Sequence, residues 1–212
     1  MVDLYCERLG PGPWAEPINA LTNIAFFVAA WAGWKLLDPG RGRPLTLALL
    51  AGLVAVIGVG SGLFHTLATP WARVLDVVPI LLFQLAFLWL YLRGVAGASA
   101  AASACGVTAL LVAALLGRQV PELLNGSVTY LPALLVLTGL GVYHWATGKQ
   151  ERGVLLVASA VFATSLVFRA VDEAACPYVP LGTHFLWHLL NALVLYLALR
   201  GLDANWRTVT PN

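Results

Sequence analysis

Five side chains able to bind a metal ion or to move protons lie within otherwise apolar stretches of the chain. Ser61 and His65 are four residues apart, as are His184 and His188, and Asp76 follows His65 after a short turn. Residues four apart share one face of an α-helix, so each pair would present both side chains to one neighbour. Because ionisable groups are costly to bury in lipid, each is a candidate functional residue.

The three histidines suggest a catalytic zinc site. Three neutral imidazoles are a sufficient protein ligand set for Zn²⁺, which leaves a fourth position to water. Zinc lowers the pKa of that water to about 7 and so supplies a nucleophile at ordinary pH. The predicted ligands are His65, His184 and His188, and the candidates for orienting them are Ser61, Asp76 and Asn191. The alternative is that the histidines are hydrogen-bonded packing residues between helices.

Other residues with possible chemistry are interpreted structurally. His144, beside Trp145, falls at the opposite membrane face and is read as an interfacial residue. Cys105 is expected to be a small buried apolar residue. The Gly58-x-x-x-Gly62 pair is expected to let neighbouring helices approach closely.

The elements that must position these residues are membrane-spanning helices. Of the 212 residues, 60% are hydrophobic and only 10% are charged, whereas soluble domains carry roughly a quarter charged residues. Mean hydropathy is +0.83. A soluble fold is therefore excluded, and a net charge of +2 is too small to indicate nucleic-acid binding. We expect an all-α, polytopic membrane protein with one membrane domain over residues 1–212.

Seven apolar segments are long enough to span a bilayer, which takes about 20 residues. They are expected near Pro17–Leu37, Leu45–Leu67, Val74–Leu92, Ser99–Leu116, Val128–Thr147, Gly153–Val171 and Gly182–Leu199. Breakers such as Asp38-Pro39-Gly40 separate them. Residues 1–16 have no apolar core typical of a signal peptide, so they are expected to remain as an N-terminal segment, and residues 200–212 form a tail.

The distribution of basic residues predicts the orientation in the membrane. Eight fall on the side opposite the N-terminus: Lys35, Arg41, Arg43, Arg93, Lys149, Arg152, Arg200 and Arg207. Four fall on the N-terminal side: Arg8, Arg73, Arg118 and Arg169. The C-terminus is therefore predicted to be cytoplasmic. The N-terminus, Asp76 and the three zinc-site histidines would face the extracytoplasmic side.

Three stretches of this sequence resemble the alkaline ceramidases, which belong to a wider group of seven-span hydrolases and receptors that includes the adiponectin and progestin receptors. The first stretch is Gly60-Ser61-Gly62-Leu63-Phe64-His65-Thr66, with Asp76 eleven residues after His65, and the second is His184-Phe185-Leu186-Trp187-His188. The third is Tyr5-Cys6-Glu7, followed by Glu16-Pro17-Ile18-Asn19-Ala20-Leu21-Thr22-Asn23. The resemblance runs from Tyr5 to about Tyr196.

The resemblance implies a zinc-dependent amidase that cleaves the N-acyl bond of ceramide into a sphingoid base and a fatty acid. It would assign His65, His184 and His188 to zinc. Asp76 would orient or deprotonate the attacking water, and Ser61 would stabilise the oxyanion. The site chemistry would suit any N-acyl lipid, and the short loops imply that substrate enters laterally from the membrane.

The resemblance also implies two features of the N-terminal segment. Some family members bind Ca²⁺ before the first span, and Glu7 and Glu16 match two of the positions, with Asp3 one place away from a third. Leu4 and Leu9 stand where the family has an aspartate and an asparagine, so Glu7 and Glu16 could instead be solvated acids on an outer loop.

Cys6 and Cys176 both fall on the predicted outer side, where disulfides persist, and the family has a comparable cysteine pair. We therefore expect these two cysteines to form a disulfide that joins the N-terminal segment to the loop before the last span. Asp172 and Glu173, near that loop, are expected to line the site entrance or to lie in solvent.

Two other function classes remain open from the sequence. The first is a lipid-sensing receptor or binding protein of the same architecture with a structural zinc. The second is a transporter, which would favour broken midplane helices and internal repeats that this sequence does not show. The Ala-, Gly-, Leu- and Arg-rich composition, with lysine only at Lys35 and Lys149, is typical of a GC-rich bacterial genome.

Overall fold

The computed structural model describes residues 1–37 and 45–206. Within these residues the regular elements are helices: α1 Pro17–Thr22, α2 Ile24–Leu36, α3 Leu45–Leu67, α4 Pro70–Gly94, α5 Ala100–Gly117, the 3₁₀ segment η2 Leu123–Tyr130, α6 Leu131–Ala146, α7 Val154–Ala170, the short α8 Asp172–Ala175, and α9 His184–Ala204. The predicted turn at Asp38-Pro39-Gly40 and the basic residues Arg41, Arg43 and Arg207 lie outside the described residues.

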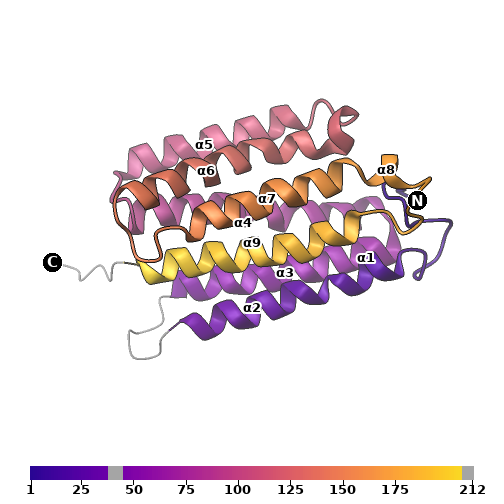
Figure 1. The fold of residues 1–212 in the computed structure, drawn as a ribbon, viewed down its shortest axis with the longest axis horizontal. Helices are drawn as coiled ribbons and strands as arrows, with labels where there is room; N and C mark the ends of the chain where they lie inside the picture. Colours follow the sequence, from indigo (N-terminus) through magenta and orange to yellow (C-terminus); the bar gives the residue numbers. More distant parts are fainter. Residues whose placement is uncertain (38–44, 207–212) are drawn as a thin grey trace.

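The long helices lie side by side along one common direction (Figure 1). In the described part of the chain, five helical stretches are long and apolar enough to cross a membrane: Leu45–Leu67, Pro70–Gly94, Ala100–Gly117, Leu123–Ala146 and His184–Ala204. Helix α7 is apolar but shorter. Several long apolar helices make this an integral membrane protein, while the count of seven spans and the orientation stay predictions.

The first expected span is divided into α1 and α2 at Asn23. Polar side chains beside the break bind backbone carbonyls: the Thr22 hydroxyl donates to Ile18 O at 2.8 Å, and Asn23 Nδ2 donates to Asn19 O at 2.8 Å. Such local bonds compete with regular helix geometry. The division therefore follows from residue types at the join.

Local capping explains why α4 begins four residues before the expected start. The Thr69 side chain accepts a hydrogen bond from Ala72 N at 3.4 Å, and Pro70 occupies the first turn. Both residues favour a helix start. Asp76 consequently lies in the second turn of α4 and not in its first.

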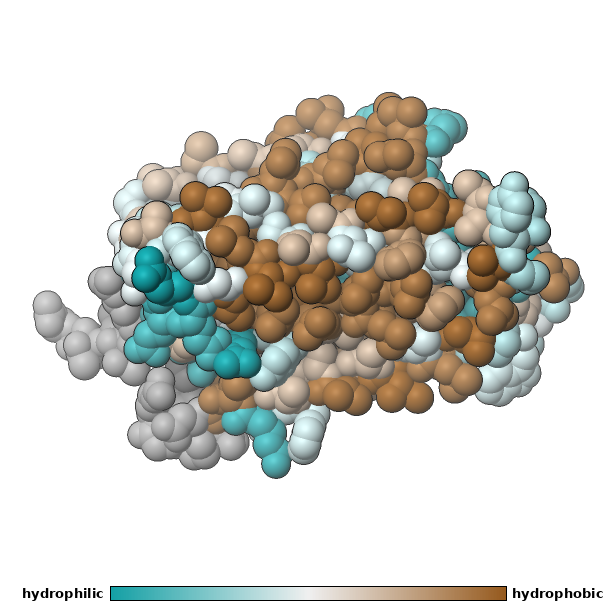
Figure 2. Space-filling model, viewed as in Figure 1, coloured by the Kyte–Doolittle hydropathy of each residue, from teal (hydrophilic) through white to brown (hydrophobic). Residues whose placement is uncertain are grey.

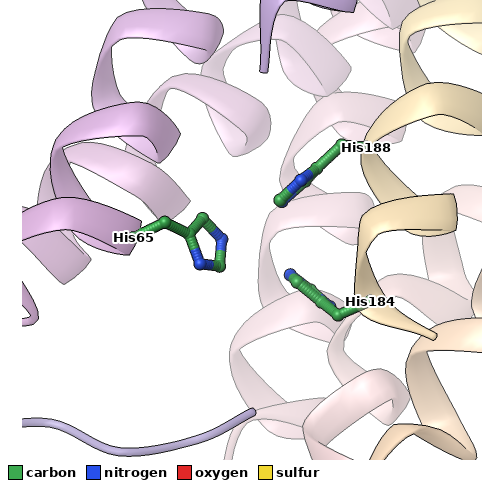
Figure 3. Close-up of side chains that lie close together, drawn as sticks. All are labelled: His65, His184 and His188. Carbon is green, nitrogen blue, oxygen red and sulfur yellow. The ribbon is translucent and has the colours of Figure 1, made fainter. Parts of the chain in front are cut away.

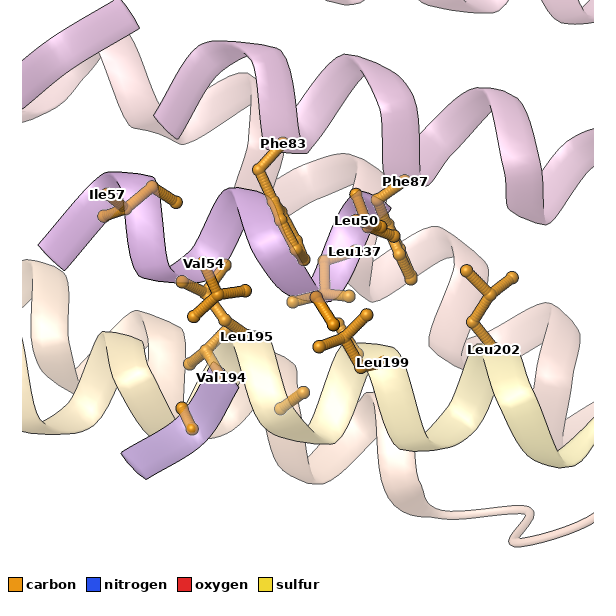
Figure 4. Packing of buried hydrophobic residues seen from close by; sticks show 14 of the residues in the cluster. Leu50, Val54, Ile57, Phe83, Phe87, Leu137, Val194, Leu195, Leu199 and Leu202 are labelled. Carbon is orange, nitrogen blue, oxygen red and sulfur yellow. The ribbon is translucent and has the colours of Figure 1, made fainter. Parts of the chain in front are cut away.

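Apolar side chains fill the centre of the bundle and also cover its outside. Leu50, Val54 and Ile57 of α3 face Val194, Leu195 and Leu199 of α9 across the core (Figure 4). On the surface, a broad hydrophobic region lies between more hydrophilic ends (Figure 2). An apolar exterior between polar ends is the pattern expected for a protein that lies in a bilayer.

A second, smaller apolar cluster holds the N-terminal segment against the bundle. Tyr5, Phe64 and Ala72 are its buried residues, and Val2 and Leu4 pack against them. Val2 N also donates to Ala68 O at 2.8 Å. The N-terminal segment therefore covers the end of the bundle where α3 ends and α9 begins.

Candidate metal centre

The three histidines singled out by their spacing meet at one end of the bundle. His65 lies near the end of α3, while His184 and His188 occupy the first two turns of α9 (Figure 3). Their rings converge, and the candidate ligand atoms all lie within 4.8 Å of one another. Among the described residues, no other group of three or more His, Cys, Asp or Glu side chains is close enough to hold a metal ion.

Two of the imidazoles are oriented by hydrogen bonds on the outer side of the cluster. His65 Nδ1 lies 2.5 Å from Glu16 Oε2, and His188 Nδ1 lies 2.9 Å from Thr22 Oγ1. A carboxylate accepts only, and the Thr22 hydroxyl lies 2.8 Å from a backbone carbonyl to which it can donate. In the tautomer with its proton on Nδ1, each ring donates to its partner, and each Nε2 keeps the lone pair that a metal requires.

The inner nitrogens of the cluster fit a metal ion. His65 Nε2 and His184 Nδ1 are buried and have no hydrogen-bond partner in the described structure. His188 Nε2 has only a long contact, at 3.5 Å, with Ser61 Oγ. Buried polar atoms without a partner are rare and costly. A divalent cation would satisfy these lone pairs, so the cluster could hold a metal.

A buried ion pair fixes the carboxylate that orients His65. Glu16 accepts hydrogen bonds from Arg8 Nε at 2.5 Å and Asn19 Nδ2 at 3.1 Å. Arg8 also donates to His65 O at 2.9 Å and thus joins the N-terminal segment to α3. Burial acts to raise the pKa of Glu16, but its hydrogen bonds to His65, Arg8 and Asn19 together hold that pKa below its ordinary value. Glu16 is therefore a fixed anion beside the cluster.

Close packing of α3 on α4 brings Ser61 to Asp76. A Cβ at Gly60 would lie 2.0 Å from the Leu75 carbonyl oxygen, so only glycine allows this approach. Ser61, the next residue on α3, therefore lies beside Asp76 of α4. On α3, a Cβ added at Gly58 or Gly60 would contact a neighbouring helix, whereas a Cβ added at Gly62 would have nothing within 4 Å. The expected role of Gly62 in helix approach was therefore wrong, because that residue faces away from the neighbouring helices.

The N-terminal segment covers the cluster from outside the bundle. The Tyr5 ring stacks on the His184 ring with centroids 3.6 Å apart. Cys6 and Cys176 are joined by a disulfide, with their Cα atoms 5.5 Å apart. One disulfide and one ring stack thus hold this segment over the start of α9.

Asp172 positions the first residue of α9. Its carboxylate accepts from Thr183 N at 2.6 Å, His184 N at 2.9 Å and Cys6 N at 3.0 Å, and it is completely buried. The expectation that Asp172 lines the entrance or lies in solvent was wrong. Its side chain accepts from the otherwise unpaired backbone amides at the start of α9. It also accepts from the backbone amide of Cys6, which the fold brings to the same place.

A cavity of about 770 Å³ opens beside Asp76. Its lining includes Tyr5 from the N-terminal segment, Val74 from α4, Thr129 from η2 and Arg169 from α7. Tyr5 contacts both this cavity and the His184 ring. The cavity therefore lies next to the histidine cluster and is large enough for part of a lipid head.

Glu7 and Glu16 are not solvated acids. Glu7 is 5% exposed and accepts the backbone amides of Ile18 at 2.7 Å and Asn19 at 2.8 Å, at the start of α1. Glu16 is bound to Arg8 and His65, and Asp3 is exposed. The calcium site stays a prediction. Glu7 and Glu16, two of the three carboxylates proposed for it, are bound to other groups of the protein.

Three further residues have contacts or exposure that the sequence did not predict. His144, in the last turn of α6, is fully buried and bonds to Tyr91 Oη at 2.8 Å and Gln150 O at 2.9 Å, while its depth in a membrane stays a prediction. Asn191 Nδ2 donates to Ser165 Oγ at 2.8 Å within the core and does not orient the histidines. Cys105 is exposed on α5 instead of buried. Helical periodicity alone did not reveal which face each of these residues occupies.

Glu16, Thr22 and Arg8 contact the histidine cluster, although the sequence did not predict these contacts. The available signals were a glutamate before Pro17 and a threonine at the break in the first apolar segment. Neither residue type indicates by itself which histidine it contacts.

Residues 12–205 match the family described as Ceramidase. The match covers the histidine cluster, Ser61, Asp76 and all the described helices. No curated protein sequence gave a match. The chain therefore belongs to the ceramidase family.

Proposed function

We propose that this protein is a zinc-dependent hydrolase of the membrane that cleaves the amide bond of an N-acyl lipid such as ceramide. Membership of the ceramidase family supports a hydrolase that acts on an amide. The buried, partnerless nitrogens of His65 and His184 are the observation that carries the metal assignment. An all-imidazole set of three favours zinc in a catalytic arrangement.

Residues around the cluster supply the rest of the chemistry. Zinc bound to the three imidazoles would provide a Lewis acid and activate water near neutral pH. Asp76 takes a proton from the attacking water and passes it to the amide nitrogen as the amine leaves. The Ser61 hydroxyl donates to the acyl oxygen as negative charge develops there. Amide and water thereby give a fatty acid and a free amine.

The cavity beside Asp76 supports entry of a lipid from the membrane. Val74 and Val78, which line it, are 56% and 40% exposed on the outer face of α4. An acyl chain could contact these valines while its polar end reaches Asp76. The N-terminal segment over His184 would exclude bulk water from the cluster.

The direct test measures metal content and turnover in the same preparation. Purified protein in detergent is incubated with ceramide labelled in its acyl chain, with and without a zinc chelator. We expect about one zinc per chain, release of labelled fatty acid, loss of release with chelator, and recovery when zinc is added back.

Histidine variants test the ligand assignment. His65→Ala, His184→Ala and His188→Ala should each lose zinc and activity together, whereas His144→Gln, at the opposite end of the bundle, should keep both. Full zinc content in all three ligand variants would reject the site. Lipid binding with zinc present but without product release would favour a receptor in place of an enzyme.

A further inference from the structure

Three arginines converge on the cavity beside Asp76. Arg73 comes from α4, Arg118 follows α5, and Arg169 comes from α7. Asp76 is the one acidic side chain among the lining residues. Three guanidinium charges against one carboxylate leave a formal charge of +2 on the lining. A neutral lipid head would leave this charge without a partner.

Arg169 holds its charge at the inner wall. It donates to Asn125 O and, at 2.9 Å, to Ser127 Oγ of η2. Its guanidinium also lies 5.3 Å from the Tyr130 ring centroid. These contacts fix the η2 segment, where Asn125 and the preceding Leu124 have positive φ values that residues other than glycine rarely adopt. Arg169 is therefore a structural cation whose field reaches the cavity.

Arg73 and Arg118, in contrast, have free donors. Both side chains are exposed and line the cavity. In the described part of the chain, neither side chain donates a hydrogen bond or forms an ion pair. Arginine presents five N–H donors in a fork that matches phosphate and carboxylate oxygens. These two residues can accept an anion without breaking an existing contact.

The same cavity has an apolar side. Val74 and Val78 are exposed on α4 and line the cavity with Leu4 and Phe64. An acidic group at the arginines and an apolar chain along the valines together describe an amphiphile. A soluble anion would use only the first of these features.

We propose that the preferred substrate is an N-acyl lipid whose amine portion carries an acidic group, with phosphate, sulfonate and carboxylate as the matching chemistries. This inference rests on the proposed hydrolase function and names its substrate class. The acidic group binds Arg73 and Arg118, and the amide lies toward Ser61 and Asp76. Arg169 keeps the inner wall positive and thereby disfavours cationic heads.

Substrate preference provides the kinetic test. Ceramide and ceramide 1-phosphate with identical chains are compared as substrates in phosphatidylcholine nanodiscs. Wild-type protein should have a kcat/KM about tenfold or more higher for the phosphate-bearing lipid, since two exposed ion pairs together contribute on that order. The double variant Arg73→Gln/Arg118→Gln should lose this preference and retain turnover of neutral ceramide.

A matched control separates recognition from a general effect of charge. Arg152→Gln removes an exposed arginine that lies over Trp145, away from the cavity, and should leave the substrate ratio unchanged. Exposed arginines also contact phosphates of the surrounding bilayer. Such contacts would affect both substrates alike, so an unchanged ratio in the double variant overturns the proposal.

A binding experiment distinguishes failure of this proposal from failure of the hydrolase function. Zinc-stripped protein is tested for binding of the same two labelled lipids, with and without millimolar inorganic phosphate. Tighter binding of the acidic lipid that depends on Arg73 and Arg118 supports the site even if neither lipid is hydrolysed. Equal binding of both lipids, or full displacement by inorganic phosphate, overturns it.

Discussion

Glu16 Oε2 lies 2.5 Å from His65 Nδ1, although the two residues are 49 positions apart. The contact joins the residue that precedes α1 to the end of α3. It makes the N-terminal segment part of the histidine cluster, since His65 receives its orientation and its tautomer from Glu16. A metal site with this support depends on residues that do not touch the metal.

Replacing the charge of Glu16 should weaken metal binding. Glu16→Gln keeps the shape of the side chain but loses the carboxylate that accepts from His65, and it leaves Arg8 without its buried partner. Loss of such a supporting group lowers metal affinity by about 10- to 100-fold. Competition with a chromophoric chelator measures the zinc affinity. The exposed Glu173→Gln is the control, and equal affinities in the two variants would contradict the role of Glu16.

The close approach of α3 and α4 should tolerate no side chain at Gly60. Gly60→Ala places a methyl group against the Leu75 carbonyl oxygen, so we expect a loss of about 3 kcal/mol in stability and displacement of Ser61 from Asp76. Gly62→Ala meets nothing within 4 Å and is the matched control. Thermal unfolding in detergent should separate the two variants, and similar midpoints would show that the helices can move apart freely.

Asp76 should be required for turnover but not for metal binding. Asp76→Asn removes the proton acceptor and leaves the three imidazoles in place. Zinc content should stay at the wild-type level, while kcat falls by about a hundredfold or more, as expected for loss of a general base. Elemental analysis and a fatty-acid release assay on one preparation give both values. An unchanged rate would remove Asp76 from the mechanism.

The disulfide should stabilise the segment that covers the cluster. In unreduced, denatured protein we expect one alkylatable thiol, from Cys105, because Cys6 and Cys176 are bonded to each other. Loss of a native disulfide typically costs about 2–5 kcal/mol, so Cys6→Ser/Cys176→Ser should unfold at a lower temperature than Cys105→Ser. Three reactive thiols before reduction would rule out the bond.

The residue pattern alone was enough to predict helices in lipid and a group of three histidines that could hold a metal. Apolar runs near 20 residues are a local property of the chain, and Leu45–Leu67 is helical over the residues expected. The i,i+4 spacing of His184 and His188 is likewise local. Alternation of the spans then placed His65 at the same end, which the structure shows as one cluster.

The tertiary structure decided which polar side chains support that cluster. Glu16 reaches His65, Thr22 reaches His188, and Asp172 reaches the backbone of His184. These contacts depend on how helices rotate and approach, which is set by packing across the whole bundle and not by neighbours in sequence. The same reason explains the unexpected burial of His144 and the three arginines around one cavity. Residue types determined what chemistry was available, and packing determined which of those residues can act together.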